Sequence, residues 1–138
     1  MRSRSVKPLQ KPNTSDCLCG SGKSAESCCH AYHAGATAPT AEALMRSRYV
    51  AYALGLEPYL LETWHMSTRP AELKLDEDPP RWLGLSIKRY EQQEIDLATV
   101  EFVARYKIGG RAYRLHETSR FVREGGRWLY LDGDIKDR

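Results

Sequence analysis

Four cysteines within thirteen residues constrain this 138-residue chain more than any other feature: Cys17, Cys19, Cys28 and Cys29. The rest of the sequence contains no further cysteine. A segment this short cannot bury much apolar surface, and clustered cysteines at such spacing are typical of a tetrahedral metal site. We therefore expect these four residues to bind one structural zinc ion.

Two disulfides, redox switching and inert thiols are the alternatives that the spacing leaves open. Residues 1–12 are basic and polar, and they lack the apolar stretch of a secretory signal. We therefore expect a cytoplasmic protein, and in that compartment clustered cysteines bind metal more often than they form disulfides. The sequence contains no run of about 18 apolar residues, so we also expect no membrane span.

The residues between the two cysteine pairs suit a compact metal-binding loop. Gly20 and Gly22 permit a sharp turn after the first pair, because glycine adopts positive φ without steric cost. Ser24 is a candidate N-cap for a helical turn over residues 25–27, which would bring the second pair to the opposite side of the ion. Lys23 is placed to offset the negative charge of four thiolates around one dication.

The pattern Cys-Leu-Cys-Gly-Ser-Gly at 17–22, followed by Cys28-Cys29, resembles the SEC-C motif, named for the carboxyl end of the SecA translocation ATPase. The resemblance implies a zinc site that serves protein interaction, with Cys29 in the position of the fourth ligand. That ligand is Cys or His in the family, so His30 and His33 are the alternatives. A site with four protein ligands has no open position for a catalytic water, which also favours a structural role.

Charge is distributed unevenly along the chain. Residues 1–40 contain five Lys or Arg and two Asp or Glu, a net charge of +3, whereas residues 41–138 contain sixteen of each. Contact with RNA or the ribosome through the basic tail is one hypothesis, and a merely solubilising tail is the simpler one.

Hydrophobic periodicity predicts an α+β domain after a breaker-rich linker at 34–40. A helix is expected from Ala41 to about Leu54, with Thr40 as N-cap and Gly55 as its end. A second helix is expected over 58–64 and a further helix start near 67–72, before an exposed loop at 76–80.

Beyond Trp82 the apolar period becomes two, as in half-buried strands. Strands are expected at about 83–92 and 100–108, and Gly109-Gly110 and Gly125-Gly126 are strong hairpin signals. The result is four antiparallel strands with helices on one face of the sheet. The predicted organisation is a flexible basic tail at 1–16, a SEC-C segment at 17–33 and the α+β domain at 34–138.

Folding the two hairpins at these glycine pairs sets the register. The first pairs Tyr106 with Tyr113, Ala104 with Leu115 and Phe102 with Glu117, and the second pairs Phe121 with Tyr130 and Ser119 with Asp132. The core face would then carry three polar residues at neighbouring positions, Glu117, Ser119 and Asp132.

Two interpretations of these polar residues compete. They are bonded at the sheet edge to Arg46, Arg48 or Arg69, or they line a polar pocket in which a carboxylate has a raised pKa and acts as acid or base. His65, beside Trp64, would be the partner base, although a histidine at a helix end is more often a packing or capping residue. A bulge of one residue would reverse the faces.

The opposite face of the sheet carries an apolar group that should be covered. It consists of Val103, Val122, Leu129 and Leu131. Formation of a homodimer through this face is therefore a further hypothesis.

Segments spread along most of the chain resemble the bacterial YchJ family. They are Ala38 to Tyr49, Tyr59-Leu60, Thr63-Trp64-His65, Trp82 to Leu85, Phe102 to Arg105, Ser119-Arg120-Phe121 and Trp128 to Gly133. The resemblance covers nearly everything from Cys17 to Asp134 and implies a fold similar to nuclear transport factor 2 and ketosteroid isomerase. In that fold, helices pack in the concavity of a curved sheet, often around a pocket. The family has no established activity to carry over.

We therefore expect a zinc-binding accessory protein whose SEC-C segment contacts another protein and whose α+β domain binds a partner or a small ligand. No Ser-His-Asp order, phosphate loop or dinucleotide fingerprint appears in the sequence, so we assume no turnover. The alternatives are a small-molecule enzyme using the pocket carboxylates with His65, and a factor associated with RNA or the ribosome.

Overall fold

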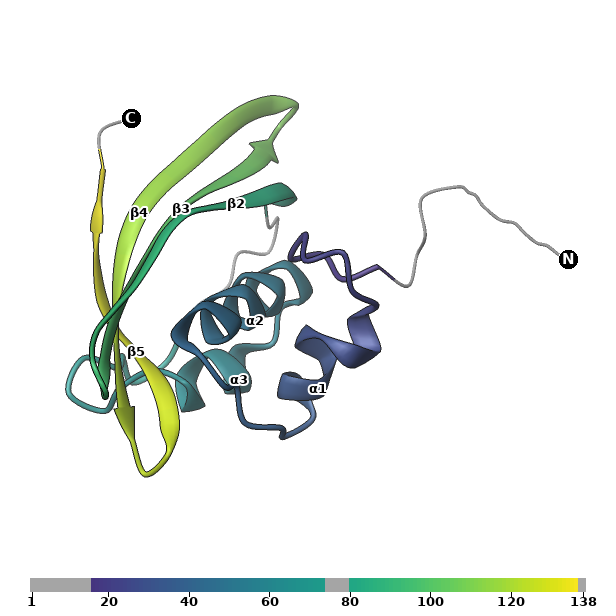
Figure 1. The fold of residues 1–138 in the computed structure, drawn as a ribbon. Coiled ribbons are helices and arrows are strands. Elements are labelled where there is room, and N and C mark those ends of the chain that lie inside the picture. Colours follow the sequence, from purple (N-terminus) through teal and green to yellow (C-terminus); the bar gives the residue numbers. More distant parts are fainter. Residues whose placement is uncertain (1–15, 74–79, 137–138) are drawn as a thin grey trace, which may run out of the picture.

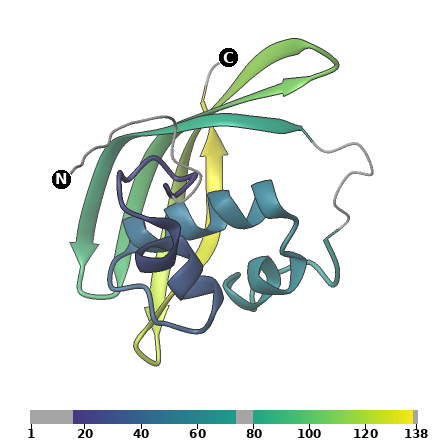
Figure 2. The ribbon, with the colours of Figure 1, turned by 90° about the vertical axis from the view of Figure 1, so that its right-hand side faces the viewer.

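The fold is described by a computed structural model, which covers residues 16–73 and 80–136. A curved antiparallel sheet holds the helices on its concave side, and α2 lies nearest the sheet (Figures 1 and 2). The strands follow one another in the order β2-β3-β4-β5. The elements are η2 (Ala25–Ser27), α1 (Cys29–His33), α2 (Ala41–Leu54), α3 (Glu57–Glu62), β2 (Arg81–Glu94), β3 (Leu97–Ile108), β4 (Arg111–Glu124) and β5 (Arg127–Ile135). The predicted α+β class is confirmed.

Helix α2 begins and ends where the sequence predicts. The side chain of Thr40 accepts a hydrogen bond from the Ala43 amide at 3.0 Å, and Gly55 ends the helix with a φ of 73°. The buried side of α2 includes Leu44, Met45 and Tyr49, so this helix carries the apolar layer that packs on the sheet.

The second predicted helix is shorter than expected. Helix α3 ends at Glu62 because the chain then runs alongside β5: the His65 amide donates to the Tyr130 carbonyl at 2.7 Å, and the Tyr130 amide donates to the Thr63 carbonyl at 2.8 Å. The further helix start predicted near 67–72 is wrong. Thr68 instead lies in a turn, and its hydroxyl donates to the Leu131 carbonyl at 2.6 Å. Most of the loop predicted at 76–80 lies outside the described residues.

The two Gly-Gly pairs form the predicted hairpins. All four glycines have φ between 57° and 81°, which residues with a side chain rarely adopt. The register of the first hairpin is confirmed, and Tyr106 stacks on Tyr113 with ring centroids 5.4 Å apart.

The register predicted for the second hairpin is wrong beyond Phe121. Phe121 does pair with Tyr130, but β5 then contains one extra residue, so that Ser119 lies opposite Gly133 and Asp132 lies opposite Arg120. A bulge of one residue turns the following side chain to the other face. Asp132 therefore points away from the helices, and its carboxylate accepts from Arg120 Nε at 2.6 Å.

The opposite face of the sheet is less apolar than the sequence suggests. Val103 is buried, with 3% of its surface exposed, and the three other residues of this group are half-buried. Ion pairs between Arg120 and Asp132 and between His116 and Glu101 lie on the same face. The homodimer stays a prediction. Within the described ranges, no helix is long and apolar enough to cross a membrane.

Candidate metal centre and central cavity

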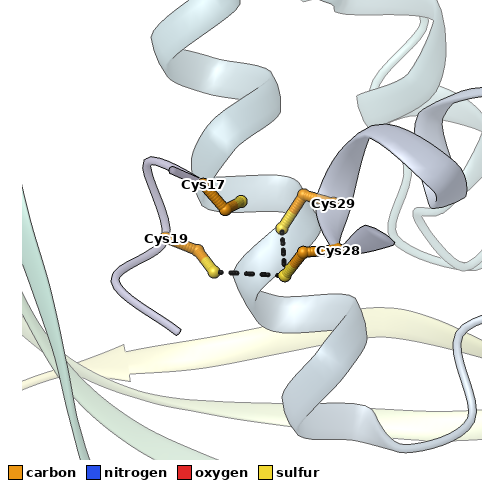
Figure 3. Close-up of side chains that lie close together, drawn as sticks. All are labelled: Cys17, Cys19, Cys28 and Cys29. Carbon is orange, nitrogen blue, oxygen red and sulfur yellow. Dashed lines mark hydrogen bonds between the residues drawn. The ribbon is translucent and has the colours of Figure 1, made fainter. Parts of the chain in front are cut away.

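The four cysteine side chains point toward one another from two sides of a small loop (Figure 3). The Sγ atoms of Cys19 and Cys28 are 3.6 Å apart, those of Cys28 and Cys29 are 3.9 Å apart, and all four lie within 4.8 Å of one another. Four sulfurs placed about 2.3 Å from one ion would be separated by about 3.8 Å. The cysteines are free thiols, and their sulfur separations exceed the S–S bond length of about 2.05 Å, so the group could hold a metal ion.

Local backbone chemistry builds this loop as the sequence predicts. Gly20 and Gly22 have φ of 82° and 88°, and the Cys17 amide donates to the Lys23 carbonyl at 2.9 Å. Ser24 caps η2 by accepting a hydrogen bond from the Ser27 amide. The second cysteine pair then lies at the junction of η2 and α1, which directs both sulfurs inward.

Crowding of the buried thiols separates their pKa values. A hydrogen bond with Cys29 lowers the pKa of Cys19 to about 4, and the same bond, together with burial, raises the pKa of Cys29. Burial also raises the pKa of Cys17. The thiols therefore resist ionising together unless a cation compensates their charge, and this is the condition that a bound dication would meet.

Neither nearby histidine belongs to the group of four sulfurs. His30 is exposed, whereas His33 Nε2 lies 2.9 Å from the Ser47 carbonyl, to which it donates. The Ser21 hydroxyl lies 3.2 Å from Cys28 Sγ, where it supports the sulfur from outside the group.

The cysteine loop packs firmly on α2, a feature that the sequence does not reveal. Arg46 Nη1 donates to the Cys19 carbonyl at 2.7 Å, while its Nε donates to Glu42 at 3.1 Å. Arg46 therefore does not bond the carboxylates of the sheet. All four cysteines belong to the same buried cluster as the apolar residues of α2 and the sheet. The boundary between a SEC-C segment and the α+β domain stays a prediction.

A cavity of about 230 Å³ lies between α2 and the sheet. Of the predicted pocket residues, Glu117 and Ser119 line it, and the Ser119 hydroxyl donates to Glu117 Oε2 at 2.8 Å. The structure does not bring His65 or Asp132 there. The lining consists of Met45, Arg48, Tyr49, Tyr52, Trp82, Phe102, Ala104, Leu115, Glu117, Ser119, Phe121 and Tyr130.

His65 has a structural position instead. Its Nδ1 accepts from the Ser67 amide at 3.0 Å, so Nε2 carries the proton and donates to Glu124 at 2.8 Å. The ring thereby ties the end of α3 to the second hairpin. The acid–base pair of His65 with Glu117 or Asp132 is not assembled.

Arg48 lines the cavity from a buried position that the sequence analysis did not predict. It was a candidate partner for the sheet carboxylates, but its Nη1 donates to the Leu60 carbonyl at 2.8 Å and to Thr63 Oγ1 at 2.7 Å. Arg69 likewise donates to a carbonyl, that of Leu61. The available signal was that Arg48 lies four residues after Leu44 and therefore on the buried stripe of α2.

A cluster of four cysteines that could hold a metal ion, packed on an α+β domain with a curved sheet, defines a SEC-C protein with a domain like nuclear transport factor 2. Residues 40–133 match the family described as YchJ, middle NTF2-like domain. A UPF0225 protein of Ralstonia nicotianae is 57% identical over 134 residues, covering 88% of this chain and 92% of its own. One from Chromobacterium violaceum is 59% identical over 123 residues, covering 85% and 90%. The chain therefore belongs to the YchJ family of UPF0225 proteins, and the predicted resemblance is confirmed.

Two solved structures agree with this assignment. The solution structure of a SEC-C motif containing protein from Rhodopseudomonas palustris matches with a TM-score of 0.76 and 35% identity, covering 88% of this chain and 98% of that one. The crystal structure of a SEC-C motif containing protein from Psychrobacter arcticus matches with a TM-score of 0.72 and 26% identity, covering 91% and 84%.

Proposed function

We propose that this protein is a cytoplasmic, zinc-containing accessory protein that docks a segment of another protein beside its metal centre. The observation that carries this proposal is a groove of about 670 Å³ formed jointly by the cysteine loop, α1, α2 and α3. The metal has a structural role here: bound by four thiolates, it holds one wall of the groove in place.

The groove has the apolar surface that a docking site needs. Leu18 from the cysteine loop and Leu54 from α2 line it, and each is 55% exposed. Leu56 and Pro58 continue the apolar surface toward α3. Large exposed apolar side chains that gather around one hollow are typical of interaction sites rather than of an inert surface.

The negative charge around the groove indicates which charge the partner segment carries. Among the described residues that line it are two carboxylates, Asp16 and Glu62, and no lysine or arginine. Four thiolates around a dication add a net charge of about −2 next to it. The partner segment therefore presents apolar side chains flanked by lysine or arginine, because a basic flank complements this field.

The metal part of the proposal is tested by elemental analysis of the purified chain. We expect one zinc per chain, and its loss when Cys17 and Cys28 are both replaced by serine. A different metal at full occupancy would contradict the assignment of zinc, and full zinc occupancy in the double variant would contradict the assignment of the ligands.

The docking part is tested with a photocrosslinking amino acid at Leu54, and at Ile95 as the control. Ile95 is 73% exposed at the β2–β3 turn, outside the groove. We expect crosslinked peptides at position 54 that combine apolar and basic residues, and we expect none of these at position 95. Identical crosslinks at both positions, or crosslinks at 54 to acidic peptides only, would overturn the proposal.

A further inference from the structure

The cavity between α2 and the sheet contains two opposite charges that do not pair with each other. Arg48 is 5% exposed, and its guanidinium and the carboxylate of Glu117 both line the cavity. Neither takes part in an ion pair within 4.0 Å among residues 16–73 and 80–136. Arg48 is buried, whereas Glu117 is half-buried. A buried charge without a counter-charge is costly, so the arrangement favours a ligand that brings a negative group to Arg48 and a positive group to Glu117.

Arg48 is held so that one edge of its guanidinium stays available. Its Nη1 makes both hydrogen bonds to the end of α3, and its planar face lies against Tyr130 and Trp64, 4.6 Å and 5.1 Å from the ring centroids. Among the described residues, Nε and Nη2 donate to no carboxylate and no backbone carbonyl, and the neighbour of the guanidinium on the cavity side is the neutral Tyr52 hydroxyl. These two groups form the edge that binds a carboxylate through two parallel hydrogen bonds.

Glu117 is held in the same way, with one oxygen free. Its Oε2 accepts from Ser119 at 2.8 Å and, more weakly, from the Tyr130 hydroxyl at 3.4 Å. Oε1 accepts none from the described residues. Gly133 makes room for this carboxylate, because a Cβ at that position would collide with Oε2 and would lie 2.8 Å from Cδ.

The remaining walls of the cavity are apolar and largely aromatic. Trp82, Phe102 and Leu115 face the space from three strands. Its volume of about 230 Å³ equals the liquid volume of roughly eight water molecules, which is room for a small organic molecule.

We propose that this cavity binds an α-amino acid with an apolar side chain. The carboxylate of the ligand accepts hydrogen bonds from the free edge of Arg48, its ammonium group donates to Glu117, and its side chain lies against the aromatic walls. A zwitterion leaves the charge balance of the cavity unchanged, whereas an anion leaves Glu117 unpaired and a cation leaves Arg48 unpaired. This inference is independent of the docking groove and of the identity of the metal.

Calorimetric titration of the metal-loaded full chain tests the class of ligand. The probes are L-leucine, 4-methylpentanoate, which lacks the amine, and 3-methylbutylamine, which lacks the carboxylate. We expect leucine to bind at least about tenfold more tightly than either analogue, because each analogue loses charged hydrogen bonds to one side of the cavity. Equal or tighter binding of an analogue, or no binding of leucine at millimolar concentration, would overturn the proposal.

Variants locate the site. Glu117→Gln should weaken leucine binding about tenfold, because the ammonium loses its charged partner, and should tighten the binding of 4-methylpentanoate, because the anion then leaves no carboxylate unpaired. Glu101→Gln is the matched control, since Glu101 bonds His116 on the other face of the sheet. Ala104→Leu should fill the cavity and abolish binding.

The wild-type protein provides a readout that does not depend on the folding of any variant. Leucine should shift the Arg48 Nε–H resonance in a nitrogen–proton NMR spectrum, since that group would bond the ligand carboxylate directly. An unmoved resonance at saturating leucine, or full affinity in folded Ala104→Leu, places the ligand elsewhere and overturns the proposal.

Discussion

At position 133 of β5, the side chain of any residue other than glycine would point at the carboxylate of Glu117. Gly133 is not among the glycines with positive φ, so its backbone conformation does not require glycine. The requirement is one of space, and it arises because the bulge in β5 sets Gly133 opposite Ser119. A substitution at Gly133 therefore tests where the Glu117 carboxylate lies.

Gly133→Ala should destabilise the fold by about 1 to 3 kcal/mol, because the new Cβ overpacks against Glu117. The double variant Gly133→Ala with Glu117→Ala should recover at least about 1 kcal/mol relative to the sum of the single changes. Urea unfolding monitored by circular dichroism measures the four free energies of the cycle.

Gly84→Ala is the control for this cycle. Gly84 also lies in a strand without positive φ, and nothing lies within 4 Å of a Cβ built there. That substitution should leave the free energy of unfolding unchanged or raise it slightly. A loss at Gly84 as large as the loss at Gly133 would show that strand propensity, and not Glu117, sets the effect.

At the scale of elements, the attachment of the cysteine loop to α2 depends on Arg46. Its charged hydrogen bond to the Cys19 carbonyl joins two segments that are far apart in the sequence. Arg46→Met keeps most of the side-chain volume and should lower the free energy of unfolding by about 1 to 2 kcal/mol. It should also speed the transfer of metal to a chelator, because the loop opens more often.

Arg89→Met is the matched control for Arg46→Met. Arg89 pairs with Glu91 on the surface of β2, where its side chain is 69% exposed, and such pairs contribute little. Its metal release should equal that of the wild type. Equal release rates in the Arg46 and Arg89 variants would mean that the loop holds its metal without help from α2.

The elements that sequence reasoning located correctly are those whose signals are local. The caps Thr40 and Gly55, the two Gly-Gly turns and the spacing of the cysteines each specify geometry within a few residues. The bulge in β5 has no such signal, because the extra residue is stabilised by a hydrogen bond from Thr68, sixty-three positions away. That tertiary contact is why Asp132 was assigned to the wrong face.

The same distinction applies to the candidate sites. The four cysteines could be grouped from spacing alone, since the candidate metal ligands come from one short segment. The cavity could not be predicted in this way, because Arg48 and Glu117 line one space only when α2 lies in the concavity of the sheet (Figure 1). Whether a polar residue on the buried side of a helix or strand lines a cavity depends on the curvature of the sheet. The spacing of apolar residues along the sequence does not encode that curvature.

For the whole molecule, the cysteine loop and the α+β domain should unfold as one unit. The four cysteines are buried in the cluster that also includes residues of α2 and of the central strands. Removal of the metal leaves buried thiols that repel one another when ionised, so the loop should open and withdraw part of that shared core. Removal of the metal should therefore lower the stability of the α+β domain as well as that of the cysteine segment.

We therefore expect the metal-free chain to melt in a single transition, about 10 °C or more below that of the metal-loaded chain, because a structural zinc site contributes several kcal/mol. Far-ultraviolet circular dichroism and the fluorescence of Trp128, which lies in the shared core, should report the same midpoint. Restoring zinc should restore that midpoint. Two separate transitions, with a fluorescence midpoint that the chelator does not change, would instead show that the cysteine segment folds as a domain of its own. In that case the core shared by the cysteine segment and the α+β domain would add no cooperativity.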